Sequence, residues 1–293
     1  MRKILLTGKT GQLGWELQRA LSPLGEIIAP DRSQMDLTNP DAIRNAIRSA
    51  APDLIVNAAG YTTVDKAEAE RDLAYQINAV APGIMAEEAR RAGALLVHYS
   101  TDYVYDGTKQ SPYDETDAPN PVNYYGKSKL AGEKAIIAAG CRYLILRASW
   151  IYSVRGTNFV LTMLRLAREK RNISVVTDQI GCPSWAKYLA TASAEIIITN
   201  NSLQNISGIY HLSATGHTAR FDFAKMIVDL AKVSSNLDPA WASIHPTTTD
   251  KYPLPAKRPL YAATSKTKVM QRFGIEIAPW QEQLTAFMKS LSW

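Results

Sequence analysis

Two side chains that could carry out acid–base chemistry together, Tyr125 and Lys129, lie four residues apart. On a helix, residues at positions i and i+4 share a face, so the phenol and the ammonium could enter one cleft. A free tyrosine has a pKa near ~10, but a fixed positive charge nearby favours the phenolate and lowers that pKa. The spacing predicts that Tyr125 donates a proton in a carbonyl reduction. Alone, the same spacing is equally typical of a solvated helix on which a lysine stem covers an aromatic ring.

A glycine-spaced turn lies near the amino terminus. The apolar run Ile4-Leu5-Leu6 is followed by Gly8, Gly11 and Gly14, and leucines then recur at helical spacing through residues 12–21. Glycines let the backbone approach a pyrophosphate, and a helix N-terminus supplies free N–H groups and partial positive charge. The order strand, turn, helix predicts a dinucleotide site. The spacing departs from Gly-x-Gly-x-x-Gly, and a tight turn without a ligand is the alternative.

The sequence argues against a phosphate-loop hydrolase and against a nucleic-acid-binding protein. Gly8-Lys9-Thr10 and Gly126-Lys127-Ser128 would each need a second glycine five residues before their own, where Lys3 and Pro121 stand. The net charge of +6 is spread along the chain, and no aromatic-basic recognition motif appears. We therefore expect an anionic small-molecule substrate and no nucleic-acid partner.

Length and composition are those of a cytoplasmic enzyme. The 293 residues, 46% of them hydrophobic, can bury a full core as one large domain or two unequal ones. No apolar stretch approaches the ~18 residues of a membrane span, and Ile4-Leu5-Leu6 is too short for a signal-peptide core. Cys141 and Cys182 have no metal-ligand spacing and suggest no disulfide framework.

In the first half of the chain, short apolar runs alternate with helical periods. The expected strands are 2–7, 26–29, 53–57, 94–99 and 143–146, and the expected helices are 12–21, 40–50, 73–92 and one that carries Tyr125. This alternation predicts an α/β fold with a Rossmann-like, doubly wound parallel sheet. Ligands of such sheets bind beyond the carboxyl ends of the strands. The polar candidates there are Gly8, Asp31, Arg32, residues 57–60 and residues 100–102.

Beyond residue 150 the alternation loosens. The expected elements are helices 159–170, 185–198, 221–232 and 280–291 and a strand over 208–212. We therefore expect a dinucleotide-binding domain over residues 1–150 and a smaller substrate-binding lobe over 151–293, with later segments interleaved with the sheet. A proline-rich and basic loop, 251–259, could cover the cleft between them.

Taken together, these motifs resemble those of the extended short-chain dehydrogenase/reductases. More narrowly, essentially the whole chain is similar to the dTDP-4-dehydrorhamnose reductases. The glycine turn and the Tyr125/Lys129 pair indicate only the superfamily. The narrower resemblance rests on residues 64–68, 100–107, 124–133, 147–150 and 178–183.

The resemblance implies a role for each candidate catalytic residue. Tyr125 would protonate the C4 oxygen of a 4-keto sugar as hydride arrives from the nicotinamide, and Thr101 would hydrogen-bond the carbonyl. Lys129 would hold the nicotinamide ribose and lower the pKa of Tyr125. The residues expected to bind substrate are Val64, Thr101, Tyr103, Tyr125 and Trp150. The alternatives are ordinary packing for Val64 and a strand-end hydroxyl bonded to nearby backbone for Thr101.

The resemblance also extends the expected cofactor site. Its residues are Gly8, Gly11, Gln12, Leu13, Gly14, Asp31, Arg32, Asp36, Leu37, Ala58, Ala59, Thr62, Tyr125 and Lys129. An acid after the second strand typically binds the ribose of NAD, whereas an arginine there can receive the 2′-phosphate of NADP. Asp31 and Arg32 supply both. We expect NADPH, with NADH as an alternative, and Asp36 and Leu37 near the adenine.

Some relatives bind Mg²⁺ at a dimer contact through glutamates. Glu16 matches one of these, but Lys187 stands where an acid would be needed, and a cation cannot ligate Mg²⁺. We therefore expect no structural metal and leave monomer and homodimer open.

The expected reaction is the NADPH-dependent reduction of dTDP-4-dehydro-L-rhamnose to dTDP-L-rhamnose. Three alternatives share parts of the pattern. A nucleotide-sugar epimerase or dehydratase would retain NAD through its cycle, and a reductase of another dTDP-4-keto-6-deoxysugar would differ in pocket shape. A regulatory subunit on this fold need not keep the catalytic set, so the intact Thr101, Tyr125 and Lys129 count against it.

Overall fold

A six-stranded parallel sheet forms the centre of the computed structural model, which describes residues 1–199, 206–234 and 241–291. Its order is β10-β5-β4-β3-β1-β2. The strands are β1 (Lys3–Thr7), β2 (Glu26–Ile28), β3 (Leu54–Asn57), β4 (Leu95–Thr101), β5 (Arg142–Ala148) and β10 (Gly208–His211). The middle strands are buried on both faces, which explains their continuous apolar runs. The predicted doubly wound parallel sheet is confirmed.

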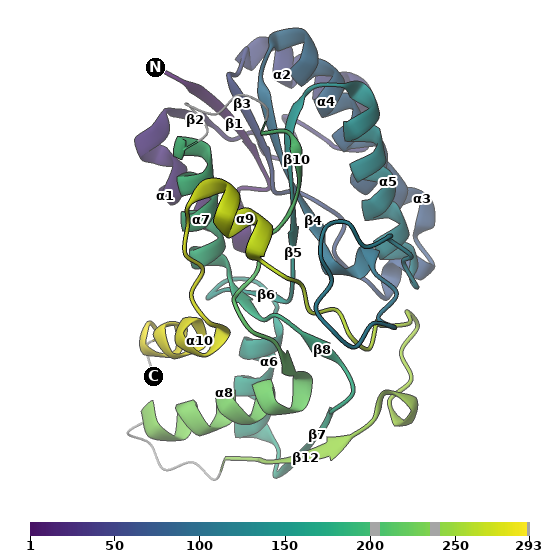
Figure 1. The fold of residues 1–293 in the computed structure, drawn as a ribbon, viewed down its shortest axis with the longest axis vertical. Helices are drawn as coiled ribbons and strands as arrows, with labels where there is room; N and C mark the ends of the chain where they lie inside the picture. The colour runs from purple at the N-terminus through teal and green to yellow at the C-terminus, as the bar shows by residue number, and fades with distance from the viewer. Residues whose placement is uncertain (200–205, 235–240, 292–293) are drawn as a thin grey trace.

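Helices cover both faces of this sheet (Figure 1). On one face lie α1 (Gln12–Leu21), α7 (Ala186–Thr199) and α9 (Thr267–Phe273), which share a core with Ile4 and Leu6. On the other lie α2 (Pro40–Ala50), α4 (Ala81–Ala92) and α5 (Tyr124–Ala139), which share a core with Leu5 and Ile55. Successive residues of β1 therefore face opposite cores, as strand geometry requires.

The single helix expected over residues 73–92 is wrong in its middle. The structure has α3 (Arg71–Tyr75), a π-helical turn (Gln76–Val80) and then α4. Pro82 stands in the first turn of α4 and has no N–H to donate to the carbonyl four residues earlier, so the regular α-helical ladder is interrupted. The interruption places Asn78 against the loop after β3, and π-helical turns of this kind often accompany functional sites.

A second hydrophobic core lies in the lower half of Figure 1. It is formed mainly by α6 (Phe159–Glu169), α8 (Arg220–Ser234), α10 (Trp280–Lys289) and the parallel pair β7 (Asn172–Val176) and β12 (Ser243–Thr247). The short strands are β6 (Ile151–Tyr152), β8 (Ile180–Gly181), β9 (Ser184–Trp185) and β11 (Thr218–Ala219). Short 3₁₀ turns cover Ser22–Leu24, Lys66–Glu68, Asp102–Val104 and Thr249–Lys251.

The chain passes between the two cores more than once. After entering the second core it returns to the sheet for α7 and β10, and again for α9. Later segments are thus interleaved with the sheet, while the division at residue 150 stays a prediction.

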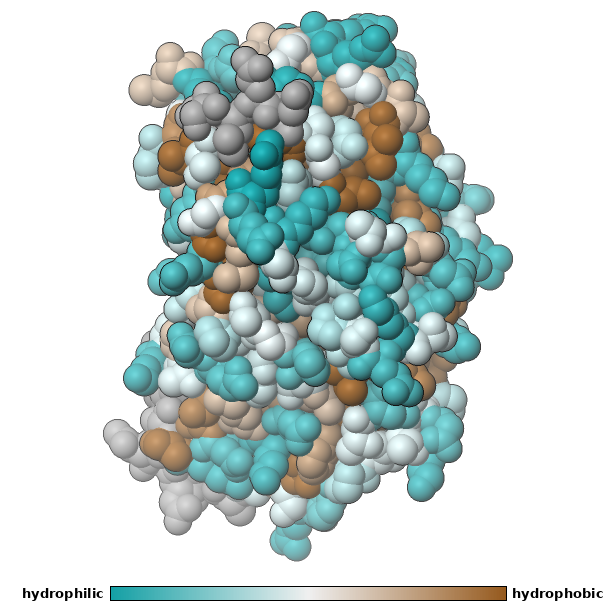
Figure 2. All heavy atoms as spheres, in the orientation of Figure 1, coloured by the Kyte–Doolittle hydropathy of each residue, from teal (hydrophilic) through white to brown (hydrophobic). Residues whose placement is uncertain are grey.

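The surface shown in Figure 2 mixes hydrophilic and hydrophobic residues, and its hydrophobic areas are small and separated. Within the described ranges, the helices are too short or too polar for any of them to cross a membrane.

Candidate active site

The start of α5 is fixed at the carboxyl edge of the sheet by three contacts. Asn123 accepts a hydrogen bond from the Gly126 N–H (2.8 Å), and Glu68 accepts one from the Tyr124 N–H (2.8 Å). A Cβ on Gly126 would collide with the carbonyl of Tyr103, so only glycine lets the helix approach this closely. The sequence around Tyr125 therefore brings its phenol to the end of β4.

Tyr125 is a protonated phenol in this position. It lies beside the Thr101 hydroxyl, and its ring meets that of Tyr103 edge-on at a centroid distance of 5.9 Å. Burial raises the pKa of Tyr125, the polar Thr101 hydroxyl lowers it, and the negative charge of Asp102 raises it again. A group that stays protonated through the neutral range suits the predicted role of proton donor.

Lys129 lies on the same helix face, one turn further along. Its Nζ donates to the backbone oxygen of Tyr99 (2.6 Å) and lies 3.2 Å from His98 Nε2. Burial lowers the pKa of Lys129 to about 8. The side chain that lowers the Tyr125 pKa here is Thr101. The expected effect of Lys129 on the Tyr125 pKa therefore stays a prediction.

The end of β4 holds a buried polar cluster. Thr101 Oγ1 accepts from the Tyr103 N–H (3.2 Å) and donates to Asp102 (3.1 Å), so it fills the strand-end role as well as reaching Tyr125. The Asp102 carboxylate also accepts from the Ser149 hydroxyl (2.7 Å). Burial raises the pKa of Asp102 to about 6, although the Ser149 bond opposes this. Asp102 and Ser149 lie in sequence motifs that gave no individual role to either residue.

The glycine turn is built as the sequence predicts. Gly8 adopts a left-handed φ of 77°, its oxygen accepts from the Gly11 N–H (2.9 Å), and a Cβ on Gly14 would collide with that same oxygen. A Cβ on Gly8 would approach Ala58 and Ala59 to 2.8 Å, so the turn packs directly on the loop after β3.

This end of α1 suits a dinucleotide. The helix begins after Gly11, which has no side chain to cap its first N–H groups. Within the described part of the chain, the buried Oε1 of Gln12 has no hydrogen-bond partner. Uncapped donors and an unpaired buried acceptor together fit a bound dinucleotide. Leu13 is buried under the turn.

The loop after β2 presents an exposed guanidinium, whereas its carboxylates are occupied by hydrogen bonds within the loop. The Asp31 carboxylate accepts from Ser33 and Gln34 in its own turn, and that of Asp36 accepts from Thr38. The Arg32 side chain is 81% exposed, with its Nε 3.7 Å from Asp36. Arg32 is thus the side chain here best able to meet a 2′-phosphate. Leu37 packs against the core beneath α2.

Trp150 sits in a constrained pocket. It is one of two non-glycine residues with positive φ (42°) in the described chain, a conformation that costs of order 1–3 kcal/mol where it is held. Its ring covers Gly181, where a Cβ would collide with the indole. The Arg220 guanidinium lies 3.6 Å from the Trp150 ring centroid and close enough to Tyr103 for its positive charge to lower the Tyr103 pKa. Arg220 was missed because it lies far along the chain and in no recognisable motif.

A second arginine joins the late part of the chain to the sheet. Asp65 accepts from Arg258 (2.8 Å) and from the Ala256 N–H (3.1 Å). Asn123 donates to the oxygen of Lys257 (2.8 Å). The loop over 251–259 therefore reaches the start of α5. Of the predicted residues nearby, Val64 is partly buried and Thr62 is exposed; their roles stay predictions.

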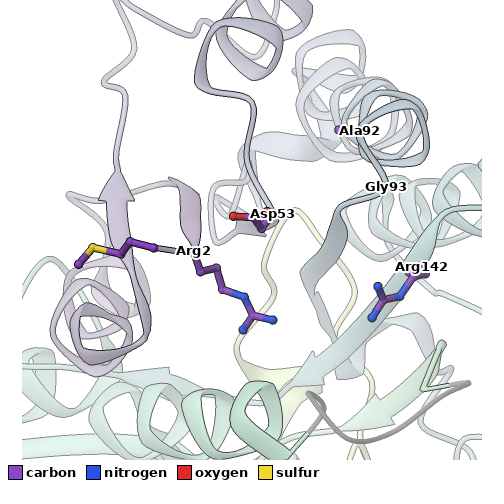
Figure 3. Close-up of a pocket in the computed structure, with 6 residues that line it drawn as sticks. Arg2, Asp53, Ala92, Gly93 and Arg142 are labelled. Atoms are coloured by element: carbon purple, nitrogen blue, oxygen red, sulfur yellow. The ribbon is translucent and has the colours of Figure 1, made fainter.

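A hollow of about 470 Å³ lies at the opposite edge of the sheet (Figure 3). It is lined by Met1, Arg2, Asp53, Ala92, Gly93 and Arg142. These residues stand at or before the amino ends of β1, β3, β4 and β5. Because parallel sheets bind ligands at the other edge, this hollow is separate from the candidate active site.

Glu16 is buried on α1. Burial raises its pKa, and the positive charges of Arg19 and Lys187 oppose that rise. No cluster of three or more His, Cys, Asp or Glu residues suited to a metal occurs in the described ranges. Both cysteines are buried and free.

The parallel sheet, the glycine turn and the Thr101, Tyr125 and Lys129 cluster define a Rossmann-fold oxidoreductase of the short-chain dehydrogenase/reductase type. A family model described as RmlD substrate binding domain matches residues 1–293. The chain therefore belongs to the RmlD substrate binding domain family.

Individual relatives agree with this assignment. The dTDP-4-dehydrorhamnose reductase of Burkholderia thailandensis is 43% identical over 284 residues, covering 95% of each chain. That of Escherichia coli K12 is 42% identical over 292 residues, covering 98% of this chain and 97% of the relative. The crystal structure of the Bacillus anthracis dTDP-4-dehydrorhamnose reductase in complex with NADP has a TM-score of 0.91 at 37% identity and covers 99% of each chain. The resemblance expected from the motifs is confirmed.

Proposed function

We propose that this chain uses NADPH to reduce the C4 keto group of dTDP-4-dehydro-L-rhamnose, giving dTDP-L-rhamnose. The observation that carries this proposal is the placement of the Thr101 hydroxyl beside the buried Tyr125 phenol at the carboxyl edge of the sheet, with Lys129 on the same helix face. The dTDP-4-dehydrorhamnose reductases at 42% and 43% identity support this choice of substrate, and the relative in complex with NADP supports this choice of cofactor. The reaction belongs in the cytoplasm.

The residues of this site divide the reaction between them. NADPH, when bound, supplies the hydride. The Tyr125 hydroxyl donates a proton to the C4 oxygen, and Thr101 hydrogen-bonds that oxygen and orients the phenol. Lys129 holds the nicotinamide ribose. The glycine turn with Gln12 receives the pyrophosphate end of the cofactor.

The substrate's charge matches the two arginines of the pocket. A dTDP-sugar carries a diphosphate, and guanidinium groups bind phosphate oxygens through paired N–H donors. Arg220 and Arg258 both act electrostatically on Tyr103, so both lie close to the sugar pocket. Val64, Tyr103 and Trp150 provide the apolar walls around the sugar. The anionic substrate accounts for an excess of positive charge without a nucleic-acid partner.

Reduction can be tested by the loss of NADPH absorbance when dTDP-4-dehydro-L-rhamnose is supplied by its upstream enzymes. We expect stoichiometric NADPH oxidation and dTDP-L-rhamnose as the product, identified by NMR. Purified protein should carry no tightly held NAD in its absorbance spectrum. Bound NAD together with sugar conversion that consumes no NADPH would instead establish an epimerase or dehydratase.

A further inference from the structure

A row of buried polar side chains crosses the sheet beneath the cofactor turn. Thr7, Asn57 and His98 occupy paired positions on the adjacent parallel strands β1, β3 and β4. They are 3%, 0% and 0% exposed, respectively. Each continues a strand face whose earlier members, Leu5 and Ile55 among them, are apolar. Three adjacent polar residues in such a place need a reason, because burial of polar groups is unfavourable unless their bonds are satisfied.

The row is connected from end to end by hydrogen bonds. The Thr7 hydroxyl donates to Asn57 Oδ1 (2.7 Å), and the Ala59 N–H also approaches that oxygen (3.3 Å). Asn57 Nδ2 lies 3.0 Å from His98 Nδ1, and His98 Nε2 lies 3.2 Å from Lys129 Nζ. The row therefore ends on Lys129 of the active site. Thr7, at one end of the row, directly precedes Gly8 of the glycine turn, and His98, at the other end, lies three residues before Thr101 on β4.

The donors and acceptors of this row determine the state of its histidine. A backbone N–H can only donate, so the Ala59 contact keeps the Asn57 oxygen away from His98 and turns the amide nitrogen toward it. The amide nitrogen donates to Nδ1, which must then be an unprotonated acceptor. Burial holds the pKa of His98 well below its usual range, and the positive charge that Lys129 carries when protonated lowers it further, so the ring is neutral in either state of Lys129. A neutral ring with a bare Nδ1 carries its hydrogen on Nε2.

That hydrogen faces Lys129. An ammonium group has three donors and no acceptor, so it cannot accept the Nε2–H, whereas an uncharged amine can. The amine would still donate to the Tyr99 carbonyl. We propose that His98 is a positioning residue for this reductase, which holds Lys129 in the cofactor-free enzyme by donating its Nε2–H to the uncharged amine. The conclusion that His98 serves the reduction rests on the proposed function, but the hydrogen bond between His98 and Lys129 does not.

The other charged groups around Lys129 do not fix it as an ammonium. Burial lowers the pKa of Lys129, and Glu133 on the same helix raises it. Glu133 is itself tied to Arg147 by a buried ion pair of 2.6 Å, which limits its effect. NADPH brings phosphate charges and ribose hydroxyls to this site, and negative charge nearby favours the ammonium. Lys129 should therefore take up a proton when the cofactor binds.

The hydrogen position can be measured directly. The chain contains four histidines, so the ring signals of ¹⁵N-histidine-labelled protein are few, and those of His98 are the ones absent from His98→Gln. We expect a neutral ring protonated on Nε2 from pH 8 to pH 9.5, where the uncharged amine of Lys129 is well populated. A ring protonated on Nδ1, or one that becomes an imidazolium in this range, would overturn the proposal. This measurement needs no turnover, so it is independent of the identity of the sugar.

Proton uptake on NADPH binding tests the consequence. Calorimetry at pH 8, where the 2′-phosphate is already ionised, can be run in buffers of different ionisation enthalpy. We expect the wild type to take up a substantial fraction of a proton. In His98→Gln the side-chain oxygen can accept from a resident ammonium, so uptake should fall by at least half and the alkaline limb of kcat against pH should move upward.

The matched control is His245→Gln, which changes an exposed histidine of the second lobe that bonds Asn172. It should bind NADPH with the same proton uptake as the wild type. If His98→Gln also leaves both the uptake and the pH profile unchanged, His98 is a packing residue only and the proposal fails.

Discussion

At the scale of single residues, the site combines groups whose protonation states are set in opposite directions by the same burial. The phenol of Tyr125 is kept protonated, whereas the ammonium of Lys129 is made easier to deprotonate. Asp102, which accepts a hydrogen bond from Thr101, has its pKa raised by burial to about 6. Such pairs of perturbed groups are typical of sites that transfer protons near neutral pH.

Asp102 makes the stability of the protein depend on pH. Its folded-state pKa of about 6 lies above its ordinary value of 3.8, so the folded state binds this proton more tightly than the unfolded state. The destabilising effect of the buried charge is therefore absent below about pH 4 and complete above about pH 6. Asp102→Asn should stabilise the fold at pH 7.5 by about 1–3 kcal/mol, the free energy of a shift of this size. Thermal unfolding at pH 4.5 should show only about a third of this gain, because the penalty is only partly expressed between the two pKa values, and an equal gain at both pH values would contradict this account.

The sequence predicted the residues that lie in motifs and missed those that do not. Tyr125, Lys129 and the glycines have fixed spacings with a chemical reason, and the structure brings them to one edge of the sheet. Arg220 reaches the site only through tertiary packing, and nothing in its local sequence marks it. The segment over residues 64–68 was predicted only as a family motif, and the structure gives two of its residues a contact each. Asp65 binds Arg258, and Glu68 accepts from the first residue of α5.

At the scale of elements, the turn between β1 and α1 is the least tolerant connection of the sheet. Gly14→Ala places a methyl group against the Gly8 carbonyl, in a position where the backbone cannot move without displacing α1. We expect NADPH affinity to fall at least tenfold, together with a loss of stability of more than about 1 kcal/mol. Gly93→Ala is the control for NADPH affinity, because Gly93 has open space around it; its left-handed φ of 67° means that alanine there also costs stability, but away from the cofactor turn. If both variants bind NADPH equally well, the turn does not hold the cofactor.

Element boundaries followed the sequence where the pattern was long and failed where it was short. The predicted helices over 12–21 and 40–50 match α1 and α2 in full. The two-residue strands have no period to detect, and the π-helical turn depends on Pro82 inside an otherwise continuous helical pattern. Tertiary contacts decide such segments, so local sequence does not predict them.

At the scale of the whole molecule, the site is formed by segments that lie far apart in the sequence. Arg220, at the start of α8, stacks on Trp150 and lies close to Tyr103, whereas Arg258 bonds Asp65. Late segments of the chain thus bring positive charge to a site whose reactive groups stand at the edge of the sheet. This division predicts that substrate and cofactor affinities can be changed separately.

Arg220→Met tests that separation. Methionine keeps an unbranched apolar side chain over Trp150 but removes the charge and the donors. The KM for the dTDP-sugar should rise at least tenfold, with the Kd for NADPH unchanged within about twofold. Arg165→Met, on an exposed face of α6, provides the control for loss of one positive charge. A fall in NADPH affinity equal to the loss of sugar affinity would place Arg220 in the cofactor site instead.

The central claim is that Tyr125 supplies the proton, and Tyr125→Phe measures it most directly. The change removes one hydroxyl and keeps the ring against Tyr103. With dTDP-4-dehydro-L-rhamnose and NADPH, we expect kcat to fall by about 10²–10⁴, the usual contribution of a general acid, while the Kd for NADPH stays within about twofold. A variant that keeps more than a tenth of the wild-type kcat would contradict the account.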